Sequence, residues 1–173
     1  MLMQVILTHS WLPMAALTAF VALGPVAARR LAGRPRAAWT AFGVALVPVA
    51  FLTLVPTGGD AEACVVTWQL PTPGNVEMVS NIALFVPPAL LAVAASRRPW
   101  LVLAGGVLGS VTIELLQTLL PALGRSCDTN DVLANTIGAA IGVALATLAL
   151  RRARRTTATE PQRSSEVEAP LSR

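Results

Sequence analysis

Charged residues are scarce in this 173-residue sequence, since only 13% of its residues are Asp, Glu, Lys or Arg. A soluble domain carries about 25% charged residues, so this chain could not cover itself with a polar surface. Apolar residues make up 54% of the sequence, and its mean hydropathy is +0.65. The shortage of charge excludes an ordinary soluble domain, and lipid is predicted to be the solvent for much of the chain.

Metal-ligating residues are equally few. The sequence has one histidine and two cysteines, with no CxxC motif and no mixed Cys/His cluster. No metal or other cofactor is therefore predicted. The sequence pI is about 10.9, but the arginines lie in short clusters between apolar runs and not in one patch. That pattern is typical of membrane orientation signals and disfavours nucleic-acid binding.

A basic segment is also missing ahead of the first apolar run. Met1–Ser10 contains no arginine, and Arg29 and Arg30 follow the run instead of preceding it. A signal peptide begins with a basic segment before its apolar core, so no cleavable signal is expected here. The first run is predicted to be a spanning helix.

Five apolar runs are long enough, or nearly so, to cross a hydrocarbon core, which needs about 20 helical residues. None alternates with period two, and lone strands cannot satisfy their backbone in lipid, so each run is predicted to be helical. The sequence thus predicts an all-α membrane protein, with residues 1–150 forming a five-helix transmembrane bundle. The predicted spans are 10–28, 38–56, 79–96, 100–120 and 131–150. Residues 151–173, rich in Thr, Ser, Glu, Arg and Pro, are predicted to form a disordered cytoplasmic tail.

The arginines also predict the orientation of the bundle. Every arginine except Arg125 lies between the first and second spans, between the third and fourth, or after the fifth. Basic residues accumulate on the cytoplasmic side of membrane proteins. The N-terminus is therefore predicted outside and the C-terminus inside, in a multi-pass protein of the bacterial cytoplasmic (inner) membrane.

Polar side chains gather near the predicted outer ends of three spans. Glu114 and Gln117 share one face of the fourth span, and Asp131 and Asn135 lie one turn apart on the fifth. A carboxylate inside a span costs several kcal/mol at the bilayer centre and rarely faces lipid. We therefore predict one outward-facing ligand-binding site. Its residues are Asn81, Glu114, Gln117, Arg125, Asp128, Asp131 and Asn135.

Two simpler roles for these residues remain open. The polar side chains could serve only to hydrogen-bond one another and hold the helices together. In the segment Asp128-Thr129-Asn130-Asp131, at least one side chain could cap the start of the fifth helix.

Small residues predict where helices approach closely. Gly105 and Gly109 form a GxxxG pattern on the fourth span, and Gly138 and Gly142 form another on the fifth. Such faces let helix backbones come close together in membranes. The two patterns are predicted to bring the fourth and fifth spans into contact.

The two cysteines, Cys64 and Cys127, both fall in predicted outer connections. Paired thiols outside the cytoplasm tend to oxidise, so a disulfide between them is predicted. The alternative is two free thiols, because a bridge requires Cα atoms within about 7 Å. A bridge would hold the first outer connection as a lid over the polar residues.

Several of these residues also form a recognisable series. It comprises Asn81-x-x-x-Phe85-x-Pro87, Glu114-x-x-Gln117, Arg125 and Asp128-x-x-Asp131-x-x-x-Asn135-x-x-Gly138-x-x-x-Gly142, with Thr53-Leu54-x-Pro56 closing the second span. From about Thr40 to Leu150, the sequence resembles the VanZ-like family of bacterial membrane proteins. The resemblance implies a link, through the family's founding member, to resistance against teicoplanin, a lipoglycopeptide antibiotic. It implies no reaction.

Three functions remain open at this point. The first is a non-enzymatic envelope protein that binds an amphiphile, such as a lipid-linked cell-envelope precursor or a lipoglycopeptide, and so contributes to antibiotic resistance. The second is a membrane enzyme that acts on a lipid headgroup with Glu114 as general acid or base. It is disfavoured, because the sequence offers no nucleophile with an adjacent base. The third is a small transporter, which the absence of an inverted repeat disfavours.

Overall fold

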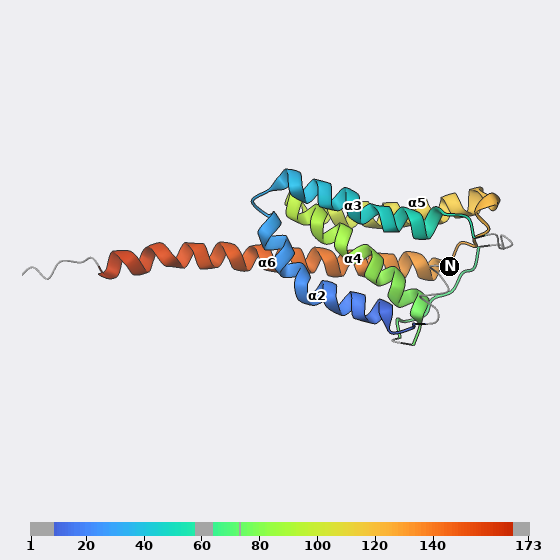
Figure 1. Ribbon diagram of the computed structural model, residues 1–173, viewed down its shortest axis with the longest axis horizontal. Coiled ribbons are helices and arrows are strands. Elements are labelled where there is room, and N and C mark those ends of the chain that lie inside the picture. Colours follow the sequence, from blue (N-terminus) through green and yellow to red (C-terminus); the bar gives the residue numbers. More distant parts are fainter. Residues whose placement is uncertain (1–8, 58–63, 73, 168–173) are drawn as a thin grey trace, which may run out of the picture.

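Five long helices make up most of the chain that the computed structural model describes, namely residues 9–57, 64–72 and 74–167 (Figure 1). They are α2 (Leu12–Leu31), α3 (Pro35–Leu54), α4 (Val76–Ser96), α5 (Pro99–Leu119) and α6 (Thr129–Val167), with a short 3-10 turn, η1 (Pro121–Leu123), before α6. Each helix holds a stretch long and apolar enough to cross a membrane, which in α6 is Thr129–Arg155. The prediction of a five-helix membrane bundle is confirmed, and the protein is a multi-pass membrane protein.

The helices begin at residues suited to a first turn. α3 and α5 start at Pro35 and Pro99, because proline lacks the N–H group that a first turn leaves unbonded. α4 starts after Asn75, whose side-chain oxygen accepts a hydrogen bond from the backbone N–H of Met78 at 3.0 Å. The sequence placed this start at residue 79, whereas the cap places it at Val76 and brings Glu77 into the first turn.

α4 and α6 form the centre of the bundle and share its most extensive helix-to-helix interface. Gly138 and Gly142 of α6 lie directly against the backbone of α4. A Cβ atom added at these glycines would overlap the carbonyl oxygens of Ile82 and Val86, respectively. The close approach predicted for this glycine face is therefore present, but its partner is the third span and not the fourth.

The other glycine pair does not pack as predicted. A Cβ atom added at Gly105 or Gly109 would meet no atom within 4 Å, so their predicted role in helix packing is wrong. Gly106 makes the contact with α6 instead, since a Cβ there would lie 2.9 Å from the Cβ of Ala139. Neighbouring positions on a helix differ by about 100° of rotation, which separates the predicted face from the observed one.

α6 does not end where the fifth span was predicted to end. It continues to Val167 and projects well beyond the other helices (Figure 1). The helix thus includes residues 151–167 of the predicted tail, and residues 168–173 lie outside the described part of the chain. The residues after position 150 are Arg-Arg-Ala-Arg-Arg. Arginine and alanine are strong helix formers, so nothing in this segment terminates the helix.

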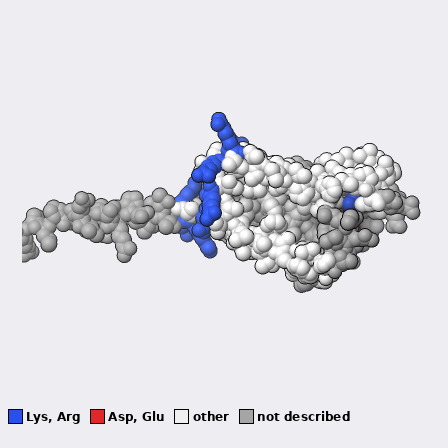
Figure 2. All heavy atoms as spheres, in the orientation of Figure 1, with Lys and Arg blue, Asp and Glu red and all other residues white. Residues whose placement is uncertain are grey.

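Arginines gather in a belt at the end of the bundle from which α6 projects (Figure 2). The belt comprises Arg29, Arg30, Arg34, Arg36, Arg97, Arg98, Arg151, Arg152, Arg154 and Arg155, at helix ends or on the projecting part of α6. We call this the arginine end. The opposite end, formed by the α3–α4 and α5–α6 connections, is called the polar end.

We expect the arginine end to face the cytoplasm, because basic residues are retained on that side of the membrane. A reporter fused after Arg155 should be active in the cytoplasm, and one inserted within residues 64–72 should be active outside. Alkaline phosphatase and green fluorescent protein fusions give opposite signals on the two sides and so control for expression. The reverse pattern would contradict the orientation.

Candidate functional site

A disulfide ties the two connections of the polar end together. Cys64 and Cys127 are bonded, with their Cα atoms 4.7 Å apart, so the predicted bridge is confirmed. Beside it, the N–H of Val65 donates to the carbonyl oxygen of Cys127 at 2.9 Å, and the N–H of Thr129 donates to that of Val65 at 3.2 Å. Residues 64–70, which we call the strap, thus lie along the start of α6.

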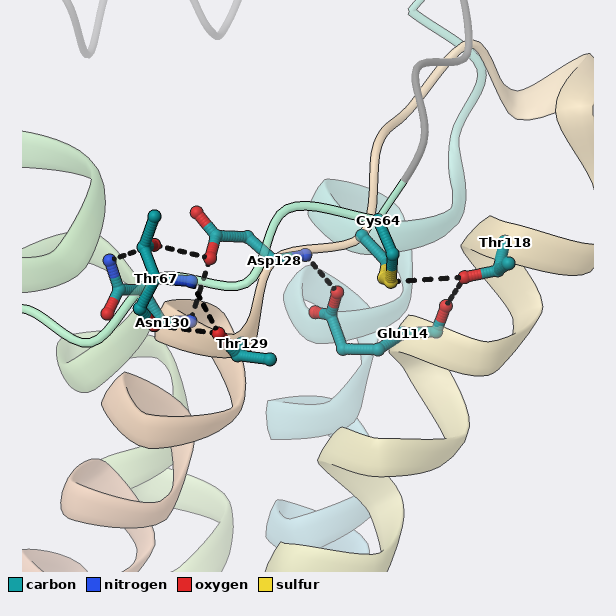
Figure 3. The surroundings of a disulfide bond; sticks show 8 residues. Cys64, Thr67, Glu114, Thr118, Asp128, Thr129 and Asn130 are labelled. Carbon is teal, nitrogen blue, oxygen red and sulfur yellow. Dashed lines mark hydrogen bonds between the residues drawn. A yellow bond between two sulfur atoms is a disulfide. The ribbon is translucent and has the colours of Figure 1, made fainter.

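Side chains at the start of α6 hold the strap further (Figure 3). The hydroxyl group of Thr67 donates to the Asp128 carboxylate at 3.0 Å. The hydroxyl group of Thr129 donates to the backbone carbonyl of Thr67 at 2.7 Å. The N–H of Gln69 donates to the Asn130 side-chain oxygen at 2.9 Å. The strap is therefore fixed by covalent and polar contacts along most of its length.

Asp128 belongs to this strap junction and not to a binding cavity. Its carboxylate also accepts a hydrogen bond from the N–H of Asn130 at 2.8 Å, as a capping residue does at a helix start. The prediction that Asp128 lines the site with the other polar residues is therefore wrong, and the capping alternative explains it. Its backbone still contributes, because the N–H of Asp128 donates to Glu114 Oε2 at 2.9 Å (Figure 3).

The other six predicted site residues do meet, around one cavity of about 300 Å³ at the polar end. They come from α4, α5, α6 and the α5–α6 connection, and they are Asn81, Glu114, Gln117, Arg125, Asp131 and Asn135. Glu114, Gln117 and Asn135 are buried, with relative exposures of 7%, 5% and 2%. The structure therefore brings these six residues together at one end of the bundle.

Each amide side chain in the cavity ties two helices together. Asn81 donates to the Asp131 carboxylate at 2.6 Å and joins α4 to α6, and Gln117 donates to the Thr53 carbonyl at 2.9 Å and joins α5 to α3. Asn135 donates to the Ser110 hydroxyl at 2.9 Å and joins α6 to α5. The helix-holding alternative is thus correct for part of the polar set.

Holding helices together does not account for every polar atom. The Oδ1 atom of Asn135 is buried and has no hydrogen-bond partner within the described part of the chain. Leaving a buried acceptor unpaired costs about 1–3 kcal/mol, so such an atom in a native structure is explained by an ordered water or ion, by strain or by a functional role. Asn135 therefore has hydrogen-bonding capacity that the described helices leave unused.

Glu77 and Thr53 also line the cavity, although neither was predicted as a site residue. Glu77 was assigned to the connection because the start of α4 was placed too late. The earlier helix start is indicated in the sequence by Asn75, a capping residue, followed by the acidic Glu77 in the first turn. With Glu77 included, three carboxylates and the single guanidinium of Arg125 line the cavity, which makes its lining acidic.

The hydroxyl groups at the cavity are bonded within their own helices. Ser80 donates to the carbonyl of Val76 at 2.6 Å, and Thr53 donates to that of Val49 at 2.7 Å. In these contacts neither hydroxyl donates to a carboxylate or a histidine, which could serve as a base. Among residues 9–57, 64–72 and 74–167, no cluster of three or more His, Cys, Asp or Glu residues could hold a metal ion.

These features define a multi-pass helical membrane protein with an acidic cavity and a disulfide-bonded strap at the same end of its bundle. The protein belongs to the VanZ/LLP1 family, whose model matches residues 36–150. The matched range covers α3 from its second residue, all of α4 and α5, and the six predicted cavity residues, whereas α2 lies outside it. No curated protein and no solved structure matches the chain.

Proposed function

We propose that this protein is a non-enzymatic protein of the bacterial cytoplasmic membrane whose cavity binds the polar headgroup of an amphiphile from the outer leaflet. A lipid-linked envelope precursor or a lipoglycopeptide would be such an amphiphile, and its capture would contribute to antibiotic resistance. The observation that carries the proposal is the cavity lined by convergent polar groups, among them Asn135, whose buried Oδ1 has no hydrogen-bond partner among the described residues.

The charges of the cavity indicate the kind of headgroup. The carboxylates of Glu77, Glu114 and Asp131 would accept hydrogen bonds from hydroxyl or ammonium groups. Arg125 donates one weak hydrogen bond, from Nε to the Val55 carbonyl at 3.5 Å, and its guanidinium would pair with a phosphate or carboxylate. A headgroup with several hydroxyl or amino groups next to one anionic group therefore fits this lining best.

The geometry supports binding more than catalysis. A nucleophilic mechanism requires a hydroxyl or thiol within hydrogen-bond reach of a base. The hydroxyl groups of Ser80 and Thr53 donate to helix carbonyls instead, and both cysteines are bonded to each other. Glu114 is left without a nucleophile to activate among these side chains.

Lipid co-purification tests the proposal. The protein would be extracted from bacterial membranes in a mild detergent, and its bound lipids would be compared by mass spectrometry with the total lipid of the same membranes. One amphiphile class should be enriched on the wild type. Glu114→Gln should lower the enrichment about tenfold, because a hydrogen bond to a charged group contributes about 1.5–3 kcal/mol. The amide keeps the shape and can still accept from the N–H of Asp128.

Leu115→Ala is the matched control, since Leu115 neighbours Glu114 but is 55% exposed on the outside of the bundle. Its lipid profile should equal that of the wild type. Equal enrichment in Glu114→Gln, or no enriched class at all, would show that the polar residues serve only to hold the helices together. Conversion of the enriched lipid by the purified protein would establish the enzyme alternative.

A further inference from the structure

A second, apolar cavity of about 460 Å³ lies on the side of the bundle. We call it the groove. α3 and α5, which touch each other only slightly, form its two walls, and buried residues of α4 such as Ala89 and Ala92 form its floor. Its lining is apolar apart from Ser96 and Arg98, which lie at the arginine end.

The groove continues the polar cavity toward the arginine end. On α3, α4 and α5, a residue that lines the groove lies one helical turn from a residue that lines the polar cavity. These pairs are Val49 and Thr53, Phe85 and Asn81, and Ile113 and Gln117. The gap between α3 and α5 is therefore polar at one end and apolar along the remainder.

The sizes of the two cavities suit different parts of a ligand. The polar cavity, at about 300 Å³, is at the lower limit of sites that bind small molecules, so it has room for a headgroup and little more. The groove extends along α5 at least from Leu101 to Ile113, which is about 18 Å at 1.5 Å per residue. That length is more than half of a hydrocarbon core of about 30 Å.

We propose that the groove holds one acyl chain of the amphiphile whose headgroup occupies the polar cavity. This inference rests on the proposed function and narrows it to acyl-bearing amphiphiles. Polar-to-apolar order along the gap matches the order of headgroup and chain in a lipid of the outer leaflet. Acyl chains are also the solvent around these helices, so the occupant reaches the groove directly from the bilayer.

Two glycines of α5 that do not pack against another helix fit the same occupant. Gly105 and Gly109 line the groove, and a Cβ atom at either would meet no protein atom within 4 Å. Without side chains at these positions, the α5 wall leaves space for a chain. Gly105→Leu would place an aliphatic side chain in that space, starting from a Cβ that meets no protein atom within 4 Å, which makes it a selective way to block the groove.

Photolabelling in cells tests the groove. Bacteria that express the protein would be grown with a fatty acid carrying a mid-chain diazirine, which enters their acyl lipids whatever the headgroup. After irradiation and purification, labelled positions would be mapped by peptide mass spectrometry. Groove residues Val102 and Ile113 should be labelled more strongly than the lipid-facing Val44 and Val47, which are 65% and 64% exposed.

Gly105→Leu should reduce the label on Val102 and Ile113 to the level of the lipid-facing positions. Gly43→Leu is the matched control, because Gly43 also has no atom within 4 Å of an added Cβ but does not line the groove. Groove labelling equal to that of Val44, or unchanged by Gly105→Leu, would overturn the proposal. Groove labelling obtained only with a photoactivatable polyprenyl phosphate would overturn the assignment to an acyl chain.

The two proposals fail in different ways. Enrichment of a lipid class that depends on Glu114, without preferential labelling of the groove, would overturn the groove assignment alone. Groove labelling that Gly105→Leu removes but Glu114→Gln leaves unchanged, with no enriched class, would overturn headgroup binding.

Discussion

Gly138→Ala is expected to destabilise the bundle strongly, whereas Gly109→Ala is expected to leave it unchanged or slightly more stable. At position 138 the new Cβ would overlap the carbonyl oxygen of Ile82 and lie 3.0 Å from the Cβ of Phe85. Backbone atoms cannot move aside as a flexible side chain can, so the cost should approach the upper part of the usual range of about 1–3 kcal/mol for overpacking. At position 109 an alanine meets nothing within 4 Å and gains in helix propensity.

The difference in stability is measured as the midpoint of thermal unfolding in a mild detergent. Unfolding is monitored by size-exclusion chromatography of samples heated to a series of temperatures. Gly138→Ala and Gly142→Ala should both lower the midpoint by several degrees relative to wild type. A similar response of Gly109→Ala and Gly138→Ala would contradict the packing of α6 on α4.

Reduction of the disulfide is the second large effect we expect. The bond joins residues that are 63 positions apart in sequence. In a chain-entropy treatment, closing a loop of that length stabilises the fold by about 4 kcal/mol, which is an upper value here because the membrane already restricts the unfolded chain. Dithiothreitol should therefore lower the thermal midpoint and release the strap from the start of α6.

Thiol labelling of the unreduced, denatured protein should find no free cysteine, and two free thiols per chain would refute the bridge. The double variant Cys64→Ser/Cys127→Ser supplies the control. Its midpoint should match that of the reduced wild type and should not respond to dithiothreitol. A double variant as stable as the oxidised wild type would show that the hydrogen bonds of Thr67, Thr129 and Asn130 hold the strap without the bond.

The spans and the polar cavity could be predicted because lipid imposes strict conditions on a sequence. Apolar runs must be long, and a carboxylate such as Glu114 must face the interior. Depth along a helix follows from counting residues at 1.5 Å each. Counting therefore placed Gln117, Asp131 and Asn135, like Glu114, within about two helical turns of the outer ends of their spans.

What counting could not provide was the rotation of each helix and the identity of its neighbour. A glycine face indicates close packing but does not name its partner, so Gly138 was paired with the wrong helix and Gly105 was given a contact it does not make. Asp128 failed for a different reason, since an acid before a helix serves equally well as a cap or as a ligand-binding group. Contacts with Thr67, which is distant in sequence, decide between the two.

The bond between Cys64 and Cys127 also gives the protein a particular covalent topology. It closes residues 64–127 into a macrocycle that contains α4 and α5, from which α3 and α2 extend as one open arm and α6 as the other. Asn81, Glu114 and Gln117 belong to the macrocycle, whereas Asp131 and Asn135 belong to an arm. The cavity is therefore lined jointly by the closed ring and by the arms that extend from it. A movement that separates Asn135 from Glu114 must therefore displace an arm relative to the ring.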